Sequence, residues 1–212
     1  MNSDFKLTET EQKVLSETRH LFGPNLTDYL LSGLGEANIT HCRAFTAHLA
    51  SPQGDDVTYR LEIRNESAQG LPSGREPLVI AVLLNLFRER QPLDDAVTFR
   101  VNDILETLEW PQTTETQLLI KQALEKYVST AYCLVDPTVS EDERSSSLYA
   151  VFMRLLVGYE TTSKLLPQKR TDQQRFIKVE FKFALQNATM GQRKHFLGIE
   201  FQNLQEMREI PC

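Results

Sequence analysis

The chain has 212 residues, of which 41% are hydrophobic and 25% are charged, an ordinary balance for a soluble globular protein. Its 23 basic and 29 acidic side chains give a formal net charge of −6. This charge excludes a protein that coats nucleic acid with a uniformly basic surface, but it allows a local basic patch. The apolar runs are shorter than the ~20 residues of a membrane span, and the polar N-terminus is no secretory signal. We therefore predict a cytoplasmic protein that does not contact the membrane.

The sequence contains no recognisable pattern of an enzyme, a cofactor site or a metal site. Cys42, Cys133 and Cys212 are scattered without a CxxC pair, and we interpret them as free thiols in a reducing compartment. A metal cluster of His41, Cys42 and His48 would lack an evident fourth ligand. Glycine-rich phosphate-binding and nucleophile-elbow motifs are absent. The sequence thus predicts no catalytic residue, no cofactor and no metal.

The first region, residues 1–65, is predicted to hold two helices and a β-hairpin. Thr8 and a glutamate three residues later form a capping-box pattern, and apolar residues then recur at helical spacing up to a glycine–proline pair. Asn25 is predicted to cap a second, short helix. Two alternating segments separated by turn residues, Cys42–Leu49 and Val57–Ile63, indicate a hairpin.

The second region, residues 66–212, begins with a loop and a run of helices around one short strand. The predicted elements are a helix over Pro77–Glu89, a strand over Val97–Val101, a helix over Asp103–Leu108 capped by Asn102, and a helix from Thr113 or Thr114 to Ala131. The turn between the last two helices has only a few residues, so these helices form a helix-turn-helix. The apolar face of the last helix is predicted to include Leu118.

Two strand-like segments, Leu148–Glu160 and Arg175–Phe183, follow and are predicted to pair across a basic connection. The second segment alternates apolar and charged residues, which is typical of a half-buried strand. His195–Phe201 is predicted to extend the sheet. A helix-turn-helix followed by a β-hairpin indicates a winged helix. The predicted fold class is α+β: a winged helix-turn-helix with an N-terminal extension of helices and a β-hairpin, and a C-terminal antiparallel sheet.

Positive charge is concentrated in one part of the chain. Between residues 164 and 195 lie eight basic and two acidic residues, a net charge of +6, so the rest of the chain carries −12. Because phosphate contact needs locally concentrated cations, this segment favours DNA binding. The alternative is a solvated sheet face whose lysines protect an edge.

The candidate DNA contacts come from the last helix and from the basic connection. Small polar side chains at a helix N-terminus can reach base edges and phosphates, and the helix dipole there favours phosphate. The alternative is a capped amphipathic helix, since this helix is neutral. Asn102 and Trp110 are assigned to capping and packing. The predicted contacts are Thr113, Thr114, Thr116, Gln117 and Lys121 on the recognition helix, and Lys164, Lys169, Arg170 and Arg175 as wing cations.

Two strings resemble plasmid replication initiators of the replication initiator protein A type. They are GLPSGREPL at Gly70–Leu78, followed by an aliphatic helix, and VTFRVNDILETLEW at Val97–Trp110. The match covers roughly residues 66–205, and its motifs are mostly caps, breakers and core positions. That family usually continues into a second winged helix, whereas this sequence ends at Cys212.

The resemblance implies a non-catalytic protein that binds repeated sites in double-stranded DNA at a plasmid origin. It also implies a homodimer and recruitment of host replication proteins. Two alternatives remain open. One is a transcriptional regulator with the same domain, and the other is a winged-helix module for protein–protein interaction or dimerisation.

Overall fold

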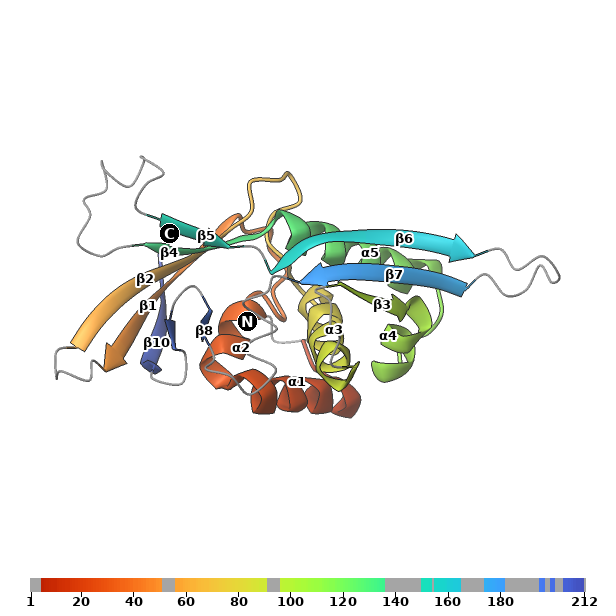
Figure 1. Ribbon diagram of the computed structural model, residues 1–212, viewed down its shortest axis with the longest axis horizontal. Coiled ribbons are helices and arrows are strands. Elements are labelled where there is room, and N and C mark those ends of the chain that lie inside the picture. Colours follow the sequence, from red (N-terminus) through yellow and green to blue (C-terminus); the bar gives the residue numbers. More distant parts are fainter. Residues whose placement is uncertain are drawn as a thin grey trace.

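The chain folds into helices packed against antiparallel sheets, which is the α+β class expected from the sequence. The computed structural model describes residues 5–50, 56–90, 96–135, 150–153, 155–164, 174–181, 195–196, 199–200 and 204–211. Within these residues a five-stranded sheet and a three-stranded sheet lie toward opposite ends of the molecule, with the first three helices between them (Figure 1).

The two N-terminal helices are α1 (Glu9–Phe22) and α2 (Pro24–Leu30). The predicted capping box is confirmed, because the Glu11 backbone N–H donates to Thr8 Oγ1 at 3.2 Å and Thr8 N–H donates to the Glu11 carboxylate at 2.9 Å. The prediction that Asn25 caps α2 is wrong. Gly23, with a φ of 80°, is both the C-cap of α1 and the N-cap of α2. Pro24 can begin α2 because the N–H that proline lacks would have no helical partner at the first position.

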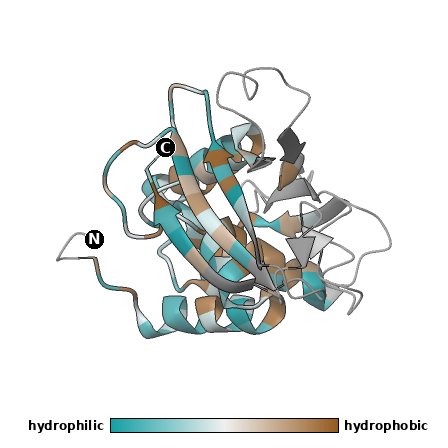
Figure 2. Cartoon of the chain, turned by 90° about the vertical axis from the view of Figure 1, so that its left-hand side faces the viewer, coloured by the Kyte–Doolittle hydropathy of each residue, from teal (hydrophilic) through white to brown (hydrophobic). Residues whose placement is uncertain are grey.

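The five-stranded sheet has the strand order β10-β1-β2-β4-β5. The predicted hairpin is confirmed, and its register runs from Cys42 opposite Arg64 to Ala50 opposite Asp56. The sheet draws strands from both sides of residue 65, and seen from its own end of the molecule it lies in front of the helices (Figure 2). Its strands are β1 (Cys42–Ala50), β2 (Asp56–Arg64), β4 (Ala131–Val135), β5 (Ala150–Met153) and β10 (Leu204–Ile210).

The second half of the fold alternates helices with a three-stranded sheet of order β3-β7-β6. Phe99 of β3 is fully buried, and in the strand register position 99 is opposite position 177 of β7. These elements are α3 (Glu76–Arg90), β3 (Ala96–Arg100), α4 (Val101–Thr107), α5 (Thr114–Ser129), β6 (Leu156–Lys164) and β7 (Gln174–Phe181).

Three predicted boundaries in this half are wrong. The segment Leu148–Glu160 is not one strand, because β5 pairs with β4 in one sheet and β6 pairs with β7 in the other. The segment His195–Phe201 does not extend a sheet, because β8 (His195–Phe196) pairs with β9 (Ile199–Glu200) in a separate two-stranded sheet. Asn102 lies inside α4, whose N-cap is Arg100, with the Arg100 N–H donating to Asp103 at 3.1 Å.

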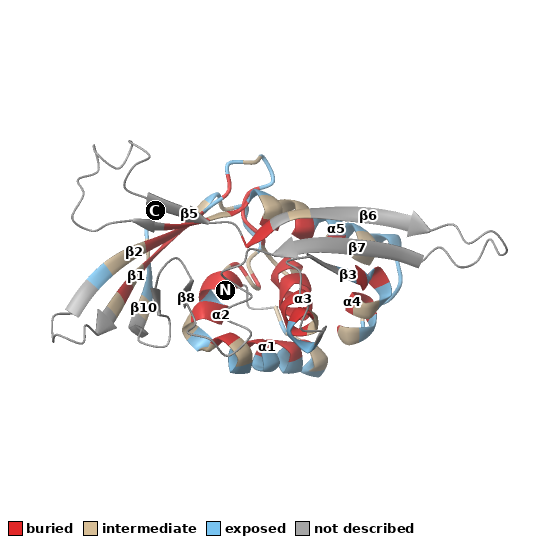
Figure 3. Cartoon of the chain, viewed as in Figure 1, coloured by how far each residue is buried: buried red, intermediate tan, exposed pale blue. Residues whose placement is uncertain are grey.

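The core is centred on α3, where every residue from Leu78 to Leu84 is fully buried. Helices α1 and α5 pack against α3, and Figure 3 shows the buried residues gathered along it. A helix that is apolar all round is stable only when other elements surround it. The position of α5 is therefore determined by packing at the centre of the molecule.

The cysteines differ from the expectation of three free thiols. Cys133 is free and buried, whereas Cys42 is disulfide-bonded. Cys42 is the first residue of β1, and its spacing from the other cysteines along the chain did not predict this bond. Among the helices in the described ranges, none combines the length and apolarity that a membrane crossing requires.

Candidate nucleic-acid interface

A tight turn orders α5 directly after α4. The turn contains Glu109 in the left-handed region with a φ of 53°, and Trp110 N–H donates to Leu105 O at 2.8 Å. Thr113 then caps α5. The predicted helix-turn-helix is thus present as two helices, α4 and α5, separated by six residues that include this turn.

Thr113 and Thr116, two of the predicted DNA contacts, are used to cap α5. Thr116 N–H donates to Thr113 Oγ1 at 3.3 Å, and Thr113 N–H donates to Thr116 Oγ1 at 3.2 Å. The Thr116 hydroxyl also donates to Pro111 O at 2.6 Å. Helix capping by itself explains why threonine stands at these two positions, and it requires no ligand. Thr114, the first residue of the helix, is exposed.

The other two predicted contacts on α5 lie farther along the helix. Gln117 is half-buried, and Lys121 is exposed. Lys121 Nζ lies 3.5 Å from Glu125 Oε1, in a pair whose side chains are 60% and 33% exposed. An exposed pair at this spacing contributes only about 0.3–0.5 kcal/mol, so Lys121 can exchange Glu125 for a phosphate at little cost.

Leu118 is exposed, and its predicted place on the buried face is wrong. Half of its surface is exposed, whereas the buried face of α5 consists of Ile120, Ala123, Leu124 and Tyr127. At 100° per residue, position 118 lies 200° from position 120, on the far side of the helix. The helical spacing of the four core residues is the feature of the sequence that could have predicted that Leu118 is exposed.

Buried polar contacts hold α5 rigidly on the core. Lys126 Nζ lies 2.8 Å from Glu76 Oε2 at the start of α3, and both side chains are almost entirely buried. The Tyr127 hydroxyl donates to Leu30 O at 3.2 Å, and burial raises the pKa of this phenol well above its ordinary value. It therefore stays a protonated donor. The outward face of α5 is presented in a fixed orientation.

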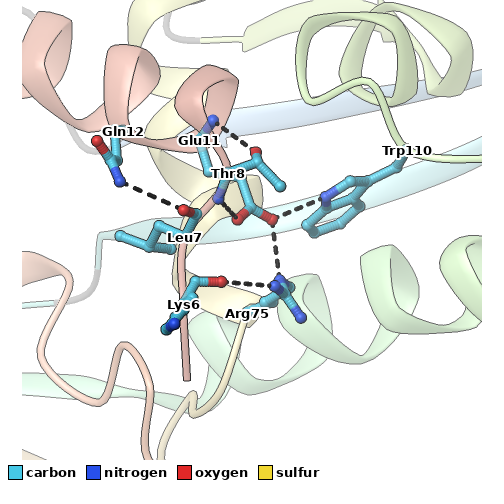
Figure 4. A network of polar contacts seen from close by, with 7 residues as sticks. All are labelled: Lys6, Leu7, Thr8, Glu11, Gln12, Arg75 and Trp110. Carbon is cyan, nitrogen blue, oxygen red and sulfur yellow. Dashed lines mark hydrogen bonds and ion pairs between the residues drawn. The ribbon is translucent and has the colours of Figure 1, made fainter. Parts of the chain in front are cut away.

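A second polar cluster joins α1 to the turn before α5 (Figure 4). The Glu11 side chain is 1% exposed, and its Oε1 accepts from Arg75 Nε at 2.9 Å and from Trp110 Nε1 at 3.0 Å. Arg75 also donates to Lys6 O at 3.0 Å and stacks over the Phe5 ring. The Trp110 indole thus packs within the protein and donates its N–H to Glu11. The charged residues of the GLPSGREPL string, Arg75 and Glu76, are both structural ion-pair partners.

The predicted wing cations fall largely outside the described residues. Lys169 and Arg170 lie outside them, while Lys164 ends β6 and Arg175 is the second residue of β7. In the strand register, position 175 is opposite Ser163 and position 164 is opposite Gln174, so positions 164 and 175 belong to opposite faces of the ribbon. The two wing cations that lie in described strands are therefore not placed on one face of the ribbon.

The hairpin and the start of α5 nevertheless lie at the same end of the molecule. Strand β6 packs against α5. The far end of β6 and the start of β7 extend in the direction of the first turn of α5 (Figure 1). The described elements at this end expose Thr114, Leu118 and Lys121. They form the candidate interface.

A cavity of about 320 Å³ between α1, α2 and the edge of the five-stranded sheet is the competing site. Its charged lining is paired internally, because Arg43 binds Glu36 and lies 3.6 Å from Glu209, and Arg19 lies 2.8 Å from Asp28. Each charged side chain of the lining thus already has a partner inside the protein. The described residues also contain no group of three His, Cys, Asp or Glu side chains able to hold a metal ion.

Comparisons with known proteins give a fold but no family. The chain is similar to a crystal structure of a selenomethionine derivative of domains 2 and 3 of RctB, with a TM-score of 0.51 and 13% identity over 77% of this chain and 60% of that one. A second structure of RctB domains 2–3 gives a TM-score of 0.49 and 13% identity, covering 81% and 64%. This chain thus matches about 60% of the length of the first RctB structure.

No protein-family model matches the chain, and no curated protein does. At 13% identity the similarity to RctB shows a shared arrangement of helices and antiparallel sheets.

Proposed function

We propose that the protein is a sequence-specific DNA-binding protein in which α3, β3, α4, α5, β6 and β7 form a winged helix, and that it acts as a plasmid replication initiator. The observation that carries the proposal is the order of these elements together with the sheet order β3-β7-β6. In this arrangement α5 is the second helix of a helix-turn-helix, the helix that enters the major groove in such proteins.

Two further features support the proposal. Helix α5 is anchored by the buried Lys126–Glu76 pair, so its exposed face can dock without a cost for ordering the helix. The segment from residue 164 to residue 195 carries a net charge of +6 and includes the connection between β6 and β7. A cationic connection beside a helix that enters the groove would contact the phosphates and position the helix.

Selection of bound sites from a random pool of double-stranded DNA, read by mobility shift, tests the proposal. Recovery of direct repeats supports a replication initiator, in line with the resemblance of residues 66–205 to that family. Recovery of a single inverted repeat favours a transcriptional regulator that uses the same domain. Failure to enrich any sequence, with self-association in the same buffer, refutes DNA binding and favours a dimerisation module.

The wing cations have a separate test. Replacing Lys169 and Arg170 together with alanine is expected to weaken binding to all sequences and to lower the slope of log K against log salt by about 1 for each lost phosphate contact. The matched control is Lys13→Ala, an exposed cation of α1 paired with Glu17. An unchanged slope in the double variant assigns the phosphate contacts to other residues.

The proposal includes no catalytic step, cofactor or metal. It includes a homodimer on repeated sites, contact with host replication proteins, and a cytoplasmic location where plasmid DNA is accessible. Sedimentation with and without the selected DNA tests the dimer, because two copies per repeat pair would add twice the mass of one chain to the DNA.

A further inference from the structure

Leu118 stands at the centre of the exposed face of α5. It is 50% exposed, and Leu118 and Ile39 are the two large hydrophobic residues that are exposed in the described part of the chain. Residues three and four positions away on a helix surround a side chain on the same face. The neighbours of Leu118 on this face are Thr114, Glu115, Lys121 and Gln122, and all four are exposed.

The exposed leucine stands among a hydroxyl, an amide, an ammonium and a carboxylate group, which are side chains of the kinds that contact base edges in the major groove. Apolar side chains there contact the C5-methyl group of thymine, and a glutamine side chain can bond the N6 and N7 edge of adenine. Leucine gains nothing from a phosphate or from a guanine–cytosine edge. Leu118 and Gln122 lie one turn apart, so they can reach neighbouring base pairs.

We infer that Leu118 is a specificity-determining residue that reads thymine methyl groups, and that the DNA site opposite α5 is rich in A·T pairs. This inference rests on the proposed DNA-binding function and adds the class of base pairs that is read. A protein partner fits the face less well, because protein interface cores are enriched in aromatic residues and depleted in lysine and glutamate, and Leu118 has Glu115 and Lys121 beside it.

The test compares the selected duplex with the same duplex in which deoxyuridine replaces thymine, so that only methyl groups are removed. Burial of one methyl group corresponds to a change of about fourfold in affinity. Wild-type protein is expected to bind the deoxyuridine duplex about fourfold more weakly for each methyl that Leu118 contacts. Leu118→Ala is expected to bind both duplexes equally, at the affinity of wild type for the deoxyuridine duplex.

Two variants serve as controls. Leu118→Met keeps an apolar side chain and should retain the preference for thymine. Ile39→Ala removes the other exposed apolar side chain, which is 68% exposed and lies outside α5, and should bind as wild type does. Alanine is a good helix former, so Leu118→Ala is expected to fold, and circular dichroism verifies this.

The outcomes separate the inference from the function on which it rests. Wild-type protein that binds the selected duplex with no preference for thymine overturns the role of Leu118 and leaves DNA binding intact. So does a Leu118→Ala variant that keeps the wild-type preference. Wild-type protein that enriches no duplex DNA overturns the proposed function and this inference together.

Discussion

Removal of the Glu11 carboxylate should loosen the joint between α1 and the turn before α5. This carboxylate is 1% exposed and accepts from three donors: the Thr8 N–H, Arg75 Nε and Trp110 Nε1. Loss of the cap interaction costs about 1 kcal/mol, and a hydrogen bond to a charged group contributes about 1.5–3 kcal/mol. Arg75 is 41% exposed and can rehydrate, so we expect Glu11→Ala to cost about 3 kcal/mol of folding stability.

Urea unfolding followed by fluorescence measures this change. Trp110 is the only tryptophan in the chain and is itself a partner of Glu11, so the probe reports directly on the joint. With a denaturant slope of about 2 kcal/mol/M, the midpoint should fall by about 1.5 M. Glu11→Gln keeps an acceptor oxygen and should lose about half as much.

The matched control is Glu9→Ala, which removes an exposed carboxylate from the same first turn of α1. Surface substitutions of this kind change stability by about 0.5 kcal/mol or less. A Glu11→Ala variant as stable as Glu9→Ala would show that the cluster contributes nothing to the joint, and the reasoning from burial and hydrogen bonding would be refuted.

Two further predictions concern stability in the core. Burial raises the pKa of Cys133 to about 12 and raises that of three buried tyrosines. The unfolded chain therefore ionises first, and stability should fall as the pH rises from about 9 to 12. The chain has six tyrosines, so tyrosinate absorbance from more than the other three that appears before the loss of circular dichroism would contradict this. Gly33 has a φ of 100°, and a Cβ there would lie 2.2 Å from Pro72 O. Gly33→Ala should therefore cost about 3 kcal/mol and lower the melting temperature by about 6–12 °C, whereas Gly158→Ala, whose Cβ would meet no atom within 4 Å, should change it little. Equal melting temperatures for the two variants would refute the steric argument. The three tyrosines are Tyr29, Tyr127 and Tyr132.

Local signals predicted the starts of α1 and α5 and the hairpin correctly, but not the starts of α2 and α4. The capping residues Thr8 and Thr113 and the alternation of β1, β2 and β7 act over a few residues, so a short stretch of sequence contains the whole cause. Strands β4 and β10 were not predicted. Their pairing partners are residues such as Ile63 and Ala44, far away along the chain.

The candidate site was predicted in part. The sequence identified α5 and its capped first turn, but placed Leu118 with the core. Thr113 and Thr116 were predicted to contact DNA, although their hydroxyls cap the helix. A short polar side chain at the start of a helix can either cap the helix or bind a ligand. Only the hydrogen bonds seen in the structure distinguish the two roles.

The amino-acid sequence by itself determined where α1 and α5 begin, that β1 and β2 form a hairpin, and that positive charge is concentrated between residues 164 and 195. These properties depend on neighbouring residues. The tertiary structure alone decided that β1 pairs with β10, that the segment Leu148–Glu160 divides between two sheets, and which face of α5 is exposed. Such features depend on contacts between distant segments, and those contacts form only when the whole core packs around α3.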